Sequence, residues 1–120
     1  MSTHDTYPLA PEPPLRIATR RGSGATVVAL AGEVDQDQRE LLRTHLAGAL
    51  DVESSCLVLD LAELRFCDSS GLNAFLQTRL EAEARGVALV LANPTPHVRR
   101  LLELTGAEQV FTIRSGARES

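Results

Sequence analysis

The chain has 120 residues, enough for one domain with a buried core, and its 43% hydrophobic and 23% charged residues are ordinary values for a globular protein. A net charge of -4 with no basic stripe argues against nucleic acid as the main partner. The apolar runs are shorter than a membrane span and the N-terminus lacks the pattern of a secretion signal, so we expect a cytoplasmic protein with no membrane partner.

The first 14 residues hold four of the six prolines, which predicts a flexible tail (1–14) before a single domain at 15–114. Leu15–Arg20 alternates apolar and polar residues, as a half-exposed strand does. Thr26–Ala31 is almost wholly apolar, as a central strand is, and the short Gly-rich link between the two predicts an antiparallel hairpin. Residues 115–120 are expected to fray.

The next segment reads as a helix. Gly32–Asp35 breaks the apolar pattern and is predicted to open a helix that reaches about Leu50. Either Asp35 or Asp37 fits the N-cap position, because Gln or Glu follows each of them three residues later, as in a capping box. One face of this helix is predicted to be apolar and to carry Leu41, Leu42, His45, Leu46, Ala49 and Leu50.

A second strand and helix follow. Cys56–Leu61 is the predicted strand and Ala62–Asp68 the predicted loop, and Cys56 and Cys67 are expected to be reduced core thiols. The helix is predicted to begin near Ser69 and to be closed by a glycine, Gly86. Its apolar face is predicted to carry Leu72, Phe75, Leu76 and Leu80.

The last third of the chain repeats this alternation. Val87–Leu91 is a predicted buried strand, Thr95 caps a short helix that has proline at its first position and ends at Gly106, and Val110–Ile113 is a last strand. Strands that alternate with helices predict an α/β domain. We expect a mixed, mainly parallel sheet of about five strands with helices between them and an antiparallel N-terminal hairpin.

Polar side chains gather at two strand–helix junctions, Gly32–Asp35 and Phe66–Gly71. Both junctions should lie at the same edge of a parallel sheet. At the second, Ser69 or Ser70 can cap the helix while the charge of Asp68 favours the helix dipole. Two hydroxyls stand where one cap would do, and the glycine that follows leaves space for another surface. A structural cap and a hydroxyl presented to another protein both remain open.

Enzymatic function has little support. A nucleophilic serine needs a base beside it, and none of the three histidines is placed by sequence next to Ser69. A phosphate loop needs a lysine, which the chain lacks. Asp35 and Asp68 could form a carboxylate pair for acid–base work or Mg²⁺, although no substrate pocket is evident. We therefore predict no catalytic residue, metal ligand or cofactor.

Three stretches together resemble the STAS domain, in particular the bacterial anti-sigma factor antagonists. They are Gly32–Asp35 before a helix, the strand Leu57–Leu61, and the turn Phe66–Leu72, which reads Phe-Cys-Asp-Ser-Ser-Gly-Leu. The resemblance covers roughly residues 15–113. It implies the fold described above and a partner-switching protein of transcription regulation in a stress response.

The resemblance also assigns roles to residues and partners. It implies that Ser69 is phosphorylated by an anti-sigma factor that is also a serine kinase, that the unphosphorylated protein binds this kinase and so releases a sigma factor, and that a PP2C-like phosphatase reverses the modification. Whether a weak homodimer forms stays open. The partner surface implied by the resemblance comprises Gly32, Glu33, Asp35, Asp68, Ser69, Ser70, Gly71, Leu72 and Asn73.

Two other function classes stay open. One is a STAS scaffold that is not phosphorylated, such as a transporter-associated subunit, in which Ser69 is a contact residue only. The other is an enzyme that depends on Asp35 and Asp68.

Overall fold

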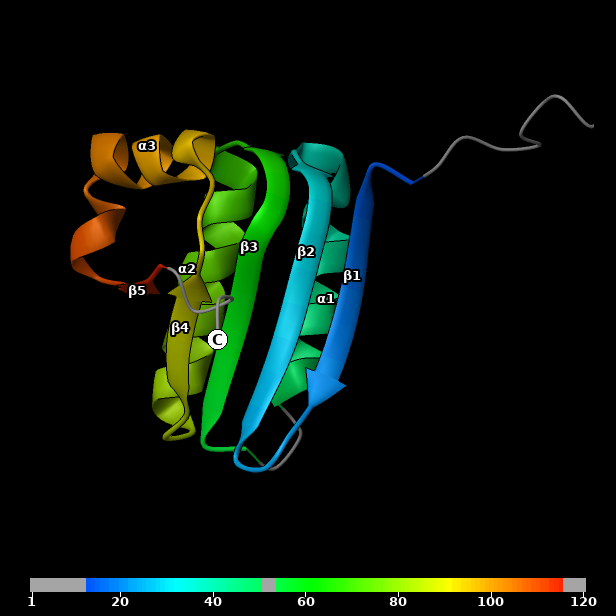
Figure 1. Cartoon of the computed structure of the whole chain (residues 1–120), viewed down its shortest axis with the longest axis vertical. Helices are drawn as coiled ribbons and strands as arrows, with labels where there is room; N and C mark the ends of the chain where they lie inside the picture. Colours follow the sequence, from blue (N-terminus) through cyan, green and yellow to red (C-terminus); the bar gives the residue numbers. More distant parts are fainter. Residues whose placement is uncertain (1–12, 51–53, 116–120) are drawn as a thin grey trace, which may run out of the picture.

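The computed structural model describes residues 13–50 and 54–115. Five strands form one sheet in the order β1-β2-β3-β4-β5, in which β1 is antiparallel to β2 and the remaining neighbours are parallel (Figure 1). The predicted fold class is therefore confirmed. The strands are β1 (Leu15–Arg21), β2 (Ala25–Val34), β3 (Cys56–Cys67), β4 (Ala88–Ala92) and β5 (Thr112–Arg114).

Three α-helices connect the parallel strands: α1 (Arg39–Leu50), α2 (Ser69–Ala84) and α3 (Pro96–Thr105). Because the strands follow one another in space as in sequence, crossovers of one hand place consecutive helices on one face of the sheet. Figure 1 shows α1 and α2 behind the sheet and α3 across its upper end. The two polar junctions predicted from the sequence lie at the rim where β2 and β3 end and α1 and α2 begin.

The core fills the layer between the sheet and these helices. Alternate residues of β2 and β3 point into it, as the burial pattern of each strand shows. The largest side chains that are fully buried include Phe75, Leu30, Leu42, Leu46, Leu59 and Leu64.

β2 and β3 are both longer than the sequence predicted. The segment expected to open a helix at Gly32 is still strand, and β3 runs through most of the predicted loop as far as Cys67. Two register shifts explain the difference, one between Ala29 and Ala31 and one between Gly32 and Glu33. At each shift β3 carries an extra residue, which interrupts the alternation of apolar and polar residues without ending the pairing.

Gly32 stays in the strand for a steric reason. Its φ of 107° is one that side chains other than glycine rarely adopt, and a Cβ at this position would collide with the carbonyl oxygen of Pro14. The same carbonyl accepts a hydrogen bond from the Glu33 N–H at 2.9 Å. This glycine therefore lets the chain that leads into β1 lie against the end of β2.

Most helix signals are confirmed. Asp35 is the N-cap, although it caps a 3₁₀ turn (Gln36–Gln38) that precedes α1, and Gln38 completes the capping box. Thr95 caps α3, and Gly106 ends it in the left-handed conformation. The glycine predicted to close α2 has a φ of 72°.

Two strand starts and the burial of three helix residues differ from the prediction. β4 and β5 begin later than expected, at Ala88 and Thr112. Leu41 and His45, predicted on the apolar face of α1, are exposed, and so is Leu80 of α2. Leu80 lies on the side of α2 opposite to its buried residues Phe75 and Ala82, and the buried stripe of α1 runs through Leu42 and Leu46 instead. The predicted tail (1–14) and frayed end (115–120) lie outside the described residues except at Pro13, Pro14 and Ser115.

Within residues 13–50 and 54–115, no helix is both long enough and apolar enough to cross a membrane.

Candidate functional site

The two polar junctions meet at the C-terminal ends of β2 and β3. Val34 and Cys67 are partners in the parallel register, and the Asp68 N–H donates a hydrogen bond of 3.2 Å to the Val34 carbonyl oxygen. Asp35 and Asp68 are the next residues along each strand, so they leave the sheet side by side. The predicted juxtaposition of the acidic turn with the Asp-Ser-Ser-Gly turn is therefore confirmed.

Asp68, and neither serine, is the N-cap of α2. Its carboxylate accepts hydrogen bonds from the Ser70 N–H at 2.8 Å and the Gly71 N–H at 3.3 Å. The expectation that Ser69 or Ser70 caps the helix is wrong, because the extended Asp68 reaches both amides first. Ser69 is instead the first helical residue, and its side chain is exposed.

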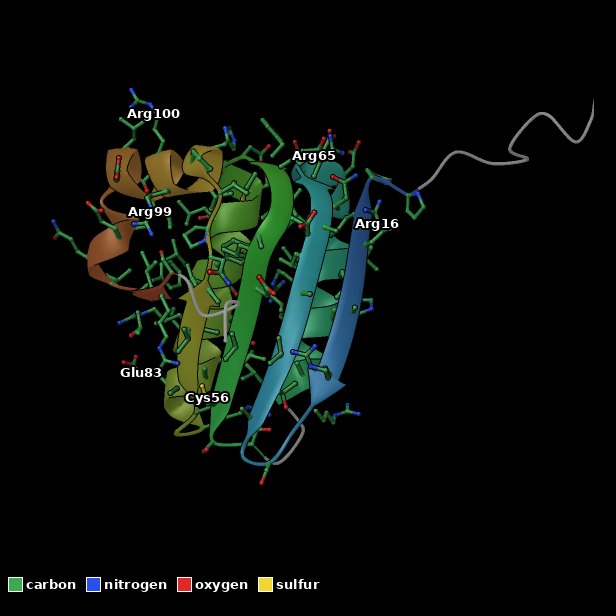
Figure 2. All side chains as sticks on the ribbon, viewed as in Figure 1. Arg16, Cys56, Arg65, Glu83, Arg99 and Arg100 are labelled. Carbon is green, nitrogen blue, oxygen red and sulfur yellow. The ribbon has the colours of Figure 1, made fainter. Side chains whose placement is uncertain are left out.

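The acidic turn is also organised by capping bonds. The Asp35 carboxylate accepts from the Asp37 N–H at 2.8 Å, and the Asp35 N–H donates to Gln38 Oε1 at 2.9 Å. Beside it, Arg65 and Glu33 approach to 3.9 Å, and both are exposed, so their attraction is weak. Figure 2 shows Arg65 at the upper end of the sheet, opposite to Cys56 at the lower end.

The predicted partner residues differ in accessibility. Glu33, Ser69 and Asn73 are exposed, whereas Asp35, Asp68 and Ser70 are half-buried. The remaining three predicted residues, Gly32, Gly71 and Leu72, are buried, Leu72 with only 5% of its surface exposed. These three shape the backbone and the core beneath the site.

Position 71 requires glycine because neighbouring residues of the same chain leave no room for a side chain. A Cβ here would lie 2.6 Å from Cys67 Sγ and 2.9 Å from Val34 Cγ1. The expectation that this glycine leaves space for another surface is therefore wrong. Its role is to let the first turn of α2 pack directly on the ends of β2 and β3.

Sequence reasoning missed an aromatic pair at this rim. Phe66 is 40% exposed, and its ring stacks on His97 with centroids 5.2 Å apart and an interplanar angle of 25°. His97 Nε2 lies 3.3 Å from the Cys67 carbonyl oxygen and donates to it. The signal is a phenylalanine two residues before the Asp-Ser-Ser-Gly turn, but only the fold brings the N-terminus of α3 beside it.

Cys67 is packed beneath the site as an inert thiol. Burial, with a smaller effect of the Asp68 charge, raises the pKa of Cys67 from 9.0 to about 12. A thiol that stays protonated at neutral pH is a poor nucleophile.

Comparison with known proteins identifies the architecture. A family model described as "Mlab, STAS domain" matches residues 17–114. The chain belongs to the STAS domain family. An anti-sigma F factor antagonist from Paenibacillus polymyxa is 30% identical over 101 residues, which cover 82% of this chain and 86% of that protein. This STAS domain thus falls among the anti-sigma factor antagonists.

Solved structures of the anti-sigma factor antagonist SpoIIAA share the fold. The unphosphorylated form aligns with a TM-score of 0.75 at 24% identity, over 87% of this chain and 90% of that chain. The phosphorylated form, described as a Bacillus cell fate determinant, aligns with a TM-score of 0.69 at 24% identity, over 87% of this chain and 94% of that chain.

Asp35 and Asp68 of this STAS domain already have structural tasks, since each caps the helical segment that follows it. Among the described residues, no group of three or more His, Cys, Asp or Glu side chains is arranged to hold a metal ion. Two hollows of about 330 and 310 Å³ lie elsewhere, between α2 and β4–β5 and between β1 and α1. Neither is lined by Ser69 or Asp35.

Proposed function

We propose that this protein is a cytoplasmic, non-enzymatic anti-sigma factor antagonist whose switch is Ser69. While Ser69 is unphosphorylated, the rim formed by Glu33, Asp35, Asp68, Ser69 and its neighbours binds an anti-sigma factor, and a sigma factor is released. The anti-sigma factor, acting as a serine kinase with ATP, phosphorylates Ser69 and dissociates. A PP2C-like phosphatase restores the binding form.

One observation carries this proposal: the Ser69 side chain is exposed and is not the helix cap. Asp68 satisfies the amides of Ser70 and Gly71, so the adjacent hydroxyl has no capping task in the fold. It can enter another protein's active site without loss of the helix start. The relationship to a P. polymyxa anti-sigma F factor antagonist and the existence of a phosphorylated form of SpoIIAA support the same assignment.

The capping geometry also explains why a phosphate at Ser69 would weaken a complex. A phosphate adds about −1.5 to −2 charges and is usually welcome at a helix N-terminus. Here the Asp68 carboxylate already occupies the Ser70 and Gly71 N–H groups. The new charge therefore adds to those of Asp68 and the neighbouring Asp35, and an interface would have to desolvate all of them.

A moderate penalty is enough for a switch. A loss of about 2.8 kcal/mol weakens binding roughly a hundredfold. No change of fold is required, because the charge changes at the binding surface itself.

The test begins with identification of the partner. The unphosphorylated protein is used to capture proteins from its native cells in ADP or in ATP, and the captured anti-sigma factor is then purified and assayed with ATP. We expect stoichiometric phosphorylation of the wild type and of Ser70→Ala, and none of Ser69→Ala, which should still bind. Full phosphorylation of Ser69→Ala would refute Ser69 as the switch.

The scaffold alternative has one observation in its favour, which is that α2 begins correctly without any modification of Ser69. Mass spectrometry of the protein from its native cells separates the two. One added phosphate on the tryptic peptide Phe66–Arg79 favours the switch. An unmodified peptide in every growth condition favours the scaffold.

A further inference from the structure

Phe66 is an unusual surface residue. Five large apolar side chains are exposed in the described part of the chain: Leu41, Phe66, Leu80, Leu104 and Val110. Leu41 lies in the first turn of α1, whereas Phe66 lies on β3 two residues before the Asp68 cap, and its backbone pairs with Glu33. A partly exposed ring three residues before a candidate switch residue is suited to contact another protein.

The ring is also held in place. It stacks on His97, whose Nε2–H donates to the Cys67 carbonyl oxygen. The N–H of the same Cys67–Asp68 peptide group donates to the Val34 carbonyl oxygen. The carbonyl and the N–H of the Cys67–Asp68 peptide group are therefore both hydrogen-bonded, the carbonyl to α3 and the N–H to β2. A ring fixed in this way loses little conformational entropy on binding.

Acidic groups outnumber basic ones at this rim. Its charged residues are five carboxylates and two guanidiniums: Glu33, Asp35, Asp37, Glu40 and Asp68, with Arg39 and Arg65. A partner surface that fits must present an apolar pocket for the ring and basic groups beside it.

We propose that the Phe66–His97 stack is the apolar anchor of the partner interface and inserts into a basic-rimmed apolar pocket of the anti-sigma factor. This inference rests on the proposed function and deepens it. Interfaces derive most of their affinity from a few buried aromatic or arginine residues, and an exposed ring held by a stack on His97 is suited to be such a residue. A phosphate on Ser69, three residues after Phe66, would add charge to the same interface and oppose its desolvation.

The first test measures affinity for the purified anti-sigma factor, obtained in the experiment on the proposed function, by titration calorimetry. Phe66→Ala should weaken binding by about tenfold or more, as removal of an anchor residue does. Leu104→Ala is the matched control, because Leu104 is also a large, exposed apolar residue (71%) but lies on α3 outside the rim, and its affinity should stay at the wild-type value. Wild-type affinity of Phe66→Ala would overturn the inference.

The second test concerns His97 as a positioning residue. His97→Phe retains a ring for stacking but loses the donor to Cys67, whereas His97→Gln retains a donor and loses the ring. If the stack positions Phe66, His97→Phe binds within about threefold of the wild type and His97→Gln binds about tenfold more weakly. The reverse order would show that the hydrogen bond matters and the stack does not.

The two proposals fail in different ways. If the wild-type protein binds no anti-sigma factor, the proposed function fails. If the wild type binds and Phe66→Ala binds equally well, only the anchor fails.

Discussion

Asp68 serves two purposes that substitution can separate. Its carboxylate caps α2, and its negative charge lies next to Ser69. Asp68→Ala should lower the free energy of unfolding by about 1 kcal/mol, as loss of an N-cap does, whereas Asp68→Asn should retain nearly all of it because asparagine caps equally well. Urea denaturation measures both. Equal destabilisation of the two variants would show that the charge stabilises the helix more than the hydrogen bonds do.

Cys67 makes stability depend on alkaline pH. Its folded-state pKa is raised from 9.0 to about 12, so the folded protein holds the thiol proton after the unfolded chain has released it. This contribution is complete below pH 9 and is lost as the pH rises toward 12. The free energy of unfolding should therefore fall over this window more steeply in the wild type than in Cys67→Ala. Identical slopes would contradict a raised pKa.

At the scale of elements, two helical glycines have opposite roles. Gly71 of α2 packs against Cys67 and Val34, whereas Gly48 of α1 has nothing within 4 Å of the position of a Cβ. Gly71→Ala should lower the free energy of unfolding by about 1–3 kcal/mol through overpacking. Gly48→Ala should raise it by about 0.5–1 kcal/mol through helix propensity. Chemical denaturation checks both, and stabilisation by Gly71→Ala would refute the tight contact between α2 and the strands.

The elements could be predicted where local chemistry decides them. Thr95 and Gly106 mark helix ends with their own side-chain or backbone preferences and have the predicted roles, and Asp35, one of two predicted caps, caps the 3₁₀ turn before α1. The predicted third strand is shorter than β3, because the length of β3 depends on its pairing with β2 through two register shifts. Each extra residue in β3 is extra only by comparison with β2. The sequence of β3 alone therefore does not show that the strand continues past it.

At the scale of the whole molecule, the candidate site could be predicted where the order of strands and helices decides it, and not where the packing of distant elements does. Asp35 and Ser69 could be brought together from sequence, because both follow strands of a parallel sheet and strand ends share an edge. The Phe66–His97 stack could not, because it depends on how α3 crosses the end of the sheet. The burial of Leu72 was predicted from its place on the apolar face of α2. That of Gly71 was not, since it depends on how closely α2 packs on Cys67 and Val34.

The whole rim combines charge with an apolar ring, and salt should separate their effects on partner binding. Ser69→Asp should fold like the wild type, with an unchanged thermal transition, because Asp68 and not Ser69 caps α2. It should bind the anti-sigma factor more weakly at about 0.1 M salt, and this defect should shrink at about 1 M, where charges are screened over about 3 Å. The defect of Phe66→Ala should persist, since burial of an apolar ring does not depend on screening. The affinities of the wild type, Ser69→Asp and Phe66→Ala at both salt concentrations test this. A Ser69→Asp defect that is independent of salt would mean that the side chain at position 69 acts by shape and not by charge.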